Sequence, residues 1–200
     1  MNRREALKNI GIGTGFVVLS SPLLTMLQSC TAEREVWTPN FLSVDEGNFL
    51  IRIVDIILPK TEGLPSATEV NVPQFIDTYW NEVLMEDEQE KQKRSIAKMV
   101  ADVKTSYGED LDDVTDEQYK EVLDKYILKK GEKDPQRDAN PNDSDFVSDY
   151  EFLGGLKWMT INAYRGSEQI GENILHYDPI PAEYYCGNLQ ELTGGRSNSL

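Results

Sequence analysis

The sequence of 200 residues is poor in the side chains that carry most enzyme chemistry. It contains one histidine, His176, and two cysteines, Cys30 and Cys186. One histidine cannot supply a histidine-based triad or a multi-histidine metal site within the chain. Glu172 with His176 also lacks the Glu-x-x-His spacing of di-iron helical bundles, and no glycine-rich phosphate loop follows the N-terminal region. The sequence therefore predicts no catalytic residue, no cofactor and no metal ion in this chain.

Positive charge is scarce as well. The chain has 20 lysines and arginines against 35 aspartates and glutamates, which gives a formal net charge of −15 at pH 7. A surface with this balance repels nucleic acid and anionic lipid headgroups. We therefore exclude nucleic-acid binding, and the acidic excess favours solubility or a positively charged partner.

The first thirty residues have the organisation of an export signal. A basic start with Arg3 and Arg4 precedes an uncharged, largely apolar run over residues 9–27, and Leu-Gln-Ser-Cys occupies 27–30. Charge, an apolar middle and a small residue before the cleavage point are the three parts of such a signal. The arginine pair is typical of twin-arginine signals, which direct folded proteins to export. Residues 27–30 resemble a bacterial lipobox, in which Cys30 becomes lipidated.

A retained membrane anchor is the alternative reading of this region. The uncharged run over 10–27 reaches the lower length limit of a membrane-spanning helix, but its glycines, serines and proline make it weakly hydrophobic. We expect a cleaved signal over 1–29, a tether over 30–42, a helical domain over 43–190 and a flexible tail over 191–200. The mature protein would have a net charge of −17 and would lie, lipid-anchored, on the periplasmic face of a bacterial membrane.

Apolar residues in the rest of the chain recur at helical spacing, and no stretch shows the alternation of a strand. We predict an all-α fold, with one compact domain of about five main helices, a short C-terminal helix and an extended tail rich in proline and tyrosine. The main helices are expected at residues 44–57, from Asn71, from Asp87 to Gly108, from Thr115 to Gly131, and from Ser144 or Asp145 to Arg165.

Local signals place the helix starts. Residues 43–46 and 115–118 have the pattern of capping boxes, and Pro73 is tolerated in a first helical turn after Asn71. Residues 131–145 carry prolines and many charges, which predicts a solvated loop. The second helix is expected to bury a wide apolar face, made of Phe75, Ile76, Tyr79, Trp80, Val83 and Leu84.

The fifth expected helix contains the adjacent glycines Gly154 and Gly155 among many large apolar residues. Each glycine costs a helix about 1 kcal/mol relative to alanine. Either another helix approaches closely there or this helix bends. We expect this helix to be the most buried element.

The C-terminal region follows a recognisable order of residues. Residues 164–171 read aromatic, small, Ser-Glu, apolar and Gly, and Tyr-Asp-Pro-Ile-Pro follows at 177–181. Tyrosines and Cys186-Gly187 come next. Together with residues 55–59 and 72–77, this order resembles subunit 3, the small subunit, of gluconate 2-dehydrogenase-type complexes. The resemblance covers nearly all of residues 41–189. Two departures affect local turns, because Ser66 and Ala182 stand where the family usually has glycine.

The resemblance implies a non-catalytic subunit. In such complexes a large flavoprotein of the glucose–methanol–choline oxidoreductase type, which holds FAD, oxidises a sugar or sugar acid, and a cytochrome c subunit can accept the electrons. The small subunit brings the large one through the twin-arginine route and holds it at the membrane. Two alternatives remain: a stand-alone surface lipoprotein that binds a ligand or a protein, and an enzyme with an unfamiliar carboxylate site.

Candidate partner contacts lie in the C-terminal region, where tyrosines are typical interface anchors. They are Tyr164, Tyr177, Pro179, Pro181, Tyr184 and Tyr185. The alternative for this aromatic and proline-rich segment is packing over its own domain. Cys186 is either a buried inert thiol or a disulfide partner of the large subunit. His176 is expected to be a polar residue beside a helix end, with a contact to the partner as the alternative.

Overall fold

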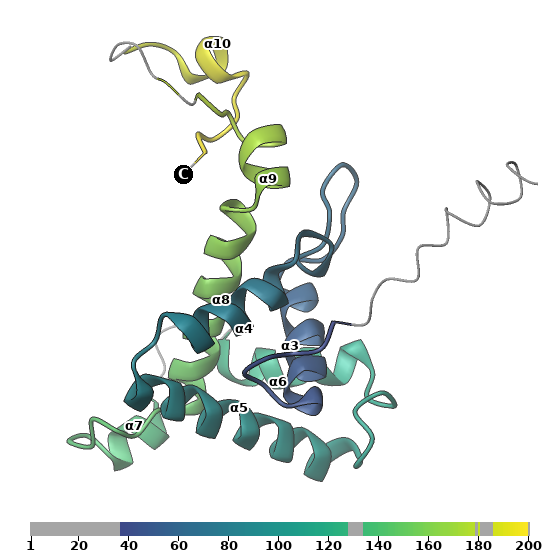
Figure 1. The fold of residues 1–200 in the computed structure, drawn as a ribbon, viewed down its shortest axis with the longest axis vertical. Helices are drawn as coiled ribbons and strands as arrows, with labels where there is room; N and C mark the ends of the chain where they lie inside the picture. The colour runs from purple at the N-terminus through teal and green to yellow at the C-terminus, as the bar shows by residue number, and fades with distance from the viewer. Residues whose placement is uncertain (1–36, 128–133, 179, 181–185, 200) are drawn as a thin grey trace, which may run out of the picture. The chain divides into compact units, whose positions relative to one another are not determined.

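A computed structural model describes residues 37–127, 134–178, 180 and 186–199, and Thr38–Leu200 form one compact unit (Figure 1). Its described elements are, in chain order, α3 (Val44–Ile57), the 3₁₀ helix η1 (Thr68–Val70), α4 (Val72–Glu82), α5 (Glu86–Tyr107), α6 (Asp116–Ile127), α7 (Pro135–Ala139), α8 (Asp149–Arg165), α9 (Glu168–Asn173) and α10 (Leu189–Thr193). Within these residues β-structure is limited to two isolated bridges. The predicted all-α fold is confirmed.

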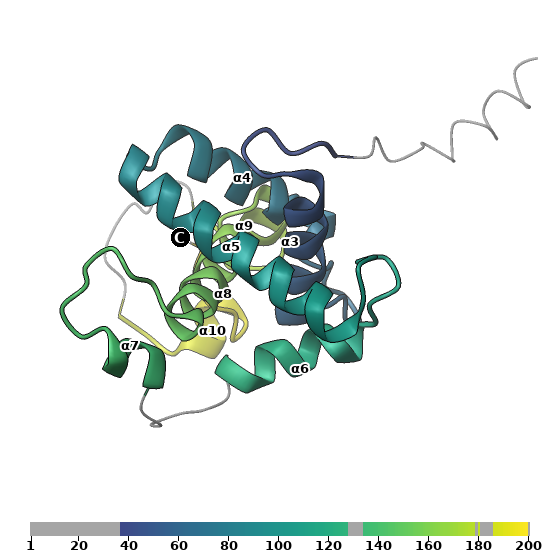
Figure 2. The same ribbon diagram turned by 90° about the horizontal axis from the view of Figure 1, so that it is seen from below.

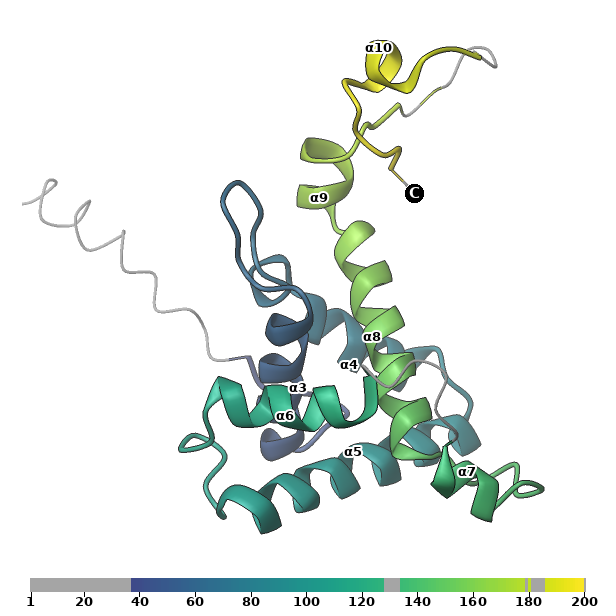
Figure 3. The same cartoon turned by 180° about the vertical axis from the view of Figure 1, so that it is seen from behind.

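Helix α8 is the element against which the others are arranged. It packs on α3, α4, α5 and α6, and α9 follows its C-terminus. Helices α4 and α6 lie on opposite sides of α8, as a comparison of Figures 1 and 3 shows. Figure 2 shows α5 crossing below α3 and α8. The central position of α8 leaves α4 with one face on the core and another beside the C-terminal half of α8.

The core is built from the inner faces of these helices. The ring of Phe49 lies 6.0 Å from that of Tyr119, and the ring of Trp80 lies 6.4 Å from that of Phe152. We expected α8 to be the most buried element, but α3 is buried more completely. Four of its side chains have no exposed surface, whereas Trp158 of α8 is 67% exposed.

Capping boxes with a serine or threonine at the N-cap start three of the described helices, α3, α6 and α8. At α3, the backbone N–H of Glu46 donates to Ser43 Oγ, and that of Ser43 donates to Glu46 Oε2. Thr115 and Gln118 make the same pair of bonds before α6. Both were predicted. The prediction for α8 began four residues too early, since its complete box is Ser148 with Glu151. A start at Ser144 would place Val147 at the third position, where no side-chain oxygen can reach back.

Asn71 precedes α4 as predicted, but its side chain makes no capping bond and its backbone is left-handed, with φ of 61°.

The structure also tests whether another helix approaches α8 closely at Gly154 and Gly155. A Cβ atom added to Gly154 or to Gly155 would meet no atom within 4 Å. Close approach of another described helix of this domain is therefore not the reason for the two glycines.

Residues 134–145 are not the simple solvated loop that we predicted. They contain α7, and charged side chains tie them to the start of α8. The guanidinium of Arg137 binds both carboxylate oxygens of Glu151 and donates to the carbonyl of Phe146. The buried carboxylate of Asp149 accepts from Lys98 Nζ at 2.8 Å and from Gln136 Nε2 at 2.7 Å. These partners lie up to 51 residues apart in sequence, which local pattern reading does not detect.

This network predicts a loss of stability in acid. Hydrogen bonds from Arg137 hold the pKa of Glu151 below its ordinary value of 4.5, although burial acts in the opposite direction. A carboxylate with a lowered folded-state pKa contributes stability above its unfolded pKa, and the contribution disappears as the pH falls through the folded pKa. Both side chains are about a third exposed, so we expect an effect below about 1 kcal/mol.

Urea unfolding of the protein at pH 7 and near pH 3 measures the contribution of the Glu151 carboxylate to the free energy of unfolding. The Glu151→Gln variant should lose less stability on acidification than the wild type, while Glu117→Gln, on the exposed surface of α6, should behave like the wild type. Equal acid losses in the wild type and in Glu151→Gln would contradict the assignment.

Candidate functional site

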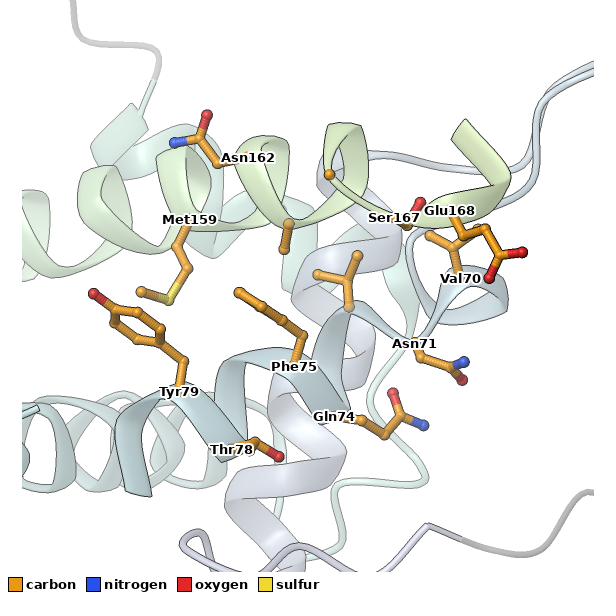
Figure 4. A pocket seen from close by; sticks show the side chains of 13 residues that line it. Val70, Asn71, Gln74, Phe75, Thr78, Tyr79, Met159, Asn162, Ser167 and Glu168 are labelled. Carbon is orange, nitrogen blue, oxygen red and sulfur yellow. The ribbon is translucent and has the colours of Figure 1, made fainter. Parts of the chain in front are cut away.

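A groove of about 680 Å³ lies between α4 and the C-terminal half of α8, and it extends to the start of α9. We call it the α4–α8 groove (Figure 4). Its lining residues come from three parts of the chain: Val70, Asn71, Val72, Gln74, Phe75, Thr78 and Tyr79; Met159, Asn162, Ala163 and Gly166; and Ser167 and Glu168. Its lining is mainly apolar.

One wall of the groove is a pair of aromatic residues on α4. Phe75 and Tyr79 are four residues apart, which places them on one side of a helix, and their rings stack at 6.1 Å with an interplanar angle of 24°. We predicted that α4 would bury these residues with Ile76 and Trp80. Only Ile76 and Trp80 enter the core, while Phe75 is 52% exposed. The apolar residues of α4 cover more of its circumference than one core-facing side can bury.

The opposite wall comes from α8. Met159 points from α8 toward the two aromatic side chains of α4 in Figure 4. Ala163 and Gly166 follow at spacings of four and three residues. Because alanine carries only a methyl group and glycine no side chain, this part of the wall projects little into the groove. An unbranched thioether beside two rings makes an adaptable apolar surface. The groove is therefore suited to bind an apolar group by shape and hydrophobic contact.

On another side of α4, Asp77 fixes the segment that precedes the first described helix. Its side chain has no exposed surface. Its carboxylate accepts hydrogen bonds from the backbone N–H groups of Asn40 at 2.8 Å, Phe41 at 3.1 Å and Leu42 at 3.0 Å. Because a buried carboxylate needs such partners, the interaction clamps residues 40–42 to α4. We call it the Asp77 clamp.

The ring of Phe41 completes the clamp. It packs edge-on against Trp80 with the ring centres 6.4 Å apart, and the ammonium group of Lys93 lies 4.3 Å from its centre. The chain between the N-terminal region and the domain thus has a fixed point of attachment at residues 40–42.

Comparison with protein families gives this domain its identity. The family model described as gluconate 2-dehydrogenase subunit 3 matches residues 44–182, which is more than half of the chain. The chain belongs to the gluconate 2-dehydrogenase subunit 3 family. The match starts at the first residue of α3 and includes Asp77 and the whole α4–α8 groove. No curated protein and no solved structure matches the chain.

The resemblance of the sequence to the subunit 3 family is therefore confirmed. Of the residues predicted to contact a partner, however, the structure buries Tyr164 and leaves Tyr177 exposed. Tyr164 is only 8% exposed, and its hydroxyl donates to the carbonyl of Pro65 at 2.7 Å. Burial raises the pKa of this hydroxyl. Tyr164 is thus a core residue that fixes the loop before η1, and its assignment to a partner interface was wrong. Tyr177, by contrast, is 46% exposed.

Cys186 is exposed, so its interpretation as a buried inert thiol was wrong. Several other candidates lie outside the residues that the structure describes: Arg3, Arg4, Cys30, Pro179, Pro181, Tyr184 and Tyr185. Their predicted roles in export, lipidation and partner binding stay predictions.

His176 lies three residues beyond the end of α9, beside a helix end as expected. Its backbone N–H donates to the carbonyl of Ser197 at 2.8 Å, and its carbonyl accepts from the N–H of Ser199 at 2.8 Å. Residues 197–199 of the expected tail are therefore paired with the chain after α9, and the expected boundary at residue 190 falls within α10.

Sequence reasoning missed both the groove and the Asp77 clamp. A weak signal for the groove was available, since six large apolar residues within the ten positions 75–84 exceed what one side of a helix can bury. Asp77 could have been noticed as a carboxylate directly beside Ile76 in an otherwise apolar stretch. Its partners, 35 to 37 residues earlier, required the folded structure.

Metal binding and membrane insertion find no site in the part of the chain that the structure describes. There, no three histidine, cysteine, aspartate or glutamate residues gather as metal ligands would. No helix within the described ranges combines the length and the apolar character needed to cross a bilayer.

Proposed function

We propose that this chain is the non-catalytic small subunit of an exported, flavin-dependent dehydrogenase complex. Membership of the gluconate 2-dehydrogenase subunit 3 family carries the proposal. The partner would be a large flavoprotein of the glucose–methanol–choline type that holds FAD and oxidises a sugar or sugar acid. A cytochrome c subunit could pass the electrons on. This chain would accompany the flavoprotein through twin-arginine export and hold it at the membrane.

The chemistry of the α4–α8 groove supports an accessory role. Its titratable lining residues are Tyr79 and Glu168, which lie on α4 and α9. General acid–base catalysis needs a group placed within hydrogen-bond reach of the reacting atom and with a pKa suited to the reaction. A mainly apolar surface with polar and acidic residues at its edges favours binding over catalysis.

The Asp77 clamp supports a role in tethering. If Cys30 is lipidated, nine residues, 31–39, separate it from the first clamped residue, Asn40, which makes ten steps along the chain. An extended chain of this length spans at most about 35 Å. The folded domain and any bound partner would therefore stay close to the membrane surface, even with a fully flexible tether.

Affinity purification of the tagged chain from detergent-solubilised membranes of its own host tests the proposal. The flavoprotein should purify with it and give the preparation the visible absorbance of a flavin. The alternative, a stand-alone lipoprotein, predicts that the chain purifies without flavin. Colourless preparations that contain this chain alone would contradict the proposed function.

Cys186 provides a further prediction. An exposed, unpaired thiol in an oxidising compartment is expected to form an intermolecular disulfide. On a non-reducing gel, the wild-type complex should show a band at the summed mass of the two subunits, which reductant removes. The Cys186→Ser variant should lack that band. The same band pattern for both proteins would exclude this disulfide.

A further inference from the structure

The α4–α8 groove has no occupant among the described residues, although its surface is costly to leave in water. Phe75 is 52% exposed, and Trp158, one helical turn before Asn162 on α8, is 67% exposed. Large exposed apolar patches on soluble proteins commonly mark interaction sites. Aromatic side chains in such patches are the residues that dominate binding energy at protein interfaces.

The form of the groove favours a macromolecule over a small ligand. Pockets for small molecules bury most of the ligand surface and orient it with a few well-placed polar groups. Here the main aromatic wall residue is itself half exposed, and the groove lies open between two helices. An amphipathic helix that lays its apolar side between two helices needs only such an open, mainly apolar channel.

The charge pattern specifies the kind of helix. Among the described lining residues Glu168 carries the only charge, and Glu82 is exposed three residues after Tyr79 on α4. The two acids belong to opposite ends of the groove, since Glu168 starts α9 and Glu82 ends α4. The part of the lining that the structure describes contains no lysine or arginine, and the whole chain has a net charge of −15. Apolar contact at the centre and basic residues at the ends complement this surface.

The unexplained glycine in α8 fits the same occupant. Gly155 lies four residues before Met159 and seven before Asn162, so it continues the groove-lining side of α8 by one turn. It is exposed, and an added Cβ would meet nothing within this domain. An open glycine on a helix surface allows a second backbone to come closer than any larger residue would.

We propose that the α4–α8 groove is the docking site for an amphipathic helix of the flavoprotein subunit, with an apolar side and flanking basic residues. This inference rests on the proposed function and adds to it the surface that makes the contact. Phe75 and Tyr79 form the aromatic wall, Met159 adapts to the inserted side chains, and Gly155 admits the helix backbone.

Three variants of the full-length tagged chain test the docking site, with the flavin-to-chain ratio of the purified complex as the readout. Phe75→Asp should lower that ratio about tenfold or more, since it places a charge among apolar contacts. Gly155→Leu should lower it similarly, without loss of thermal stability, because the free chain has room for the side chain. Val44→Asp places the same charge at a valine in the first turn of α3 that is 64% exposed, and it should keep the ratio.

A photo-cross-linking amino acid at position 162 identifies the occupant directly, with position 120 on α6 as the control. Both positions are exposed, and α6 lies on the far side of α8 (Figure 3). An adduct with the flavoprotein at 162 but not at 120 supports the proposal. An adduct with a second copy of this chain overturns it in favour of self-association.

The outcomes separate the docking site from the proposed function. If the wild type carries flavoprotein, while Phe75→Asp and Gly155→Leu keep it fully and position 162 gives no adduct, the docking site is wrong and the proposed function stands. If the wild type itself carries no flavoprotein, both are wrong.

Discussion

Replacement of Arg3 and Arg4 by lysines should leave this protein and the proposed flavoprotein partner in the cytoplasm. Lysine keeps the positive charge but lacks the planar guanidinium group, which the twin-arginine receptor is expected to require. We expect the exported fraction of both proteins to fall more than tenfold. Cell fractionation followed by immunoblotting for this chain and a flavin-dependent dehydrogenase assay measures the two fractions.

The matched control is Arg34→Lys, which makes the same chemical change in the expected tether. Export should then be unchanged. If the double lysine variant reduces export of this chain but leaves the flavoprotein exported, the two proteins travel separately and the export part of the proposal is wrong.

The second large effect concerns the Asp77 clamp. Asp77→Ala should lower the free energy of unfolding by about 3–5 kcal/mol, because it leaves the backbone N–H groups of residues 40–42 without their acceptor. Asp77→Asn keeps the size and one acceptor oxygen and should cost less. Urea unfolding curves of the three proteins give the differences.

Asp55 provides the comparison. Its carboxylate accepts one backbone N–H, from Thr68 at 2.8 Å, so Asp55→Ala should cost about 1 kcal/mol. Equal losses for Asp55→Ala and Asp77→Ala would show that the three bonds at Asp77 do not carry the stability assigned to them.

The helical framework could be predicted because its determinants are local. A serine or threonine followed three residues later by glutamate or glutamine defines a helix start over four residues, and this pattern placed α3 and α6 correctly. The same rule would have placed α8, since Ser148 with Glu151 satisfies it and Ser144 does not. Where the prediction failed, it had used the cap residue without its partner.

The surface features could not be predicted, because they depend on which side of each helix faces the core. The spacing of the apolar residues Phe75, Ile76, Tyr79 and Trp80 predicts a helix with a wide apolar side. It does not show that only Ile76 and Trp80 are buried in the core. Tyr164 illustrates the reverse error. We predicted a partner contact for it because tyrosines are typical interface anchors, yet the carbonyl of Pro65, 99 residues earlier, accepts the hydrogen bond of its hydroxyl.

Long-range ion pairs are another feature that could not be predicted from the sequence. The contact of Arg137 with Glu151 attaches the charged, proline-containing stretch of α7 to α8, and that of Lys98 with Asp149 attaches α5 to α8. Composition alone describes such a stretch as solvated, because a charged residue with a partner and one without a partner look the same in a sequence.

The location of the flavoprotein in cells that lack this chain tests the central claim most directly. Deletion of the gene, followed by fractionation and a flavin-dependent dehydrogenase assay, should find the flavoprotein in the cytoplasm, and expression of the wild-type chain should restore it to the exported, membrane-bound fraction. Full export of the flavoprotein in the deletion strain would contradict the account.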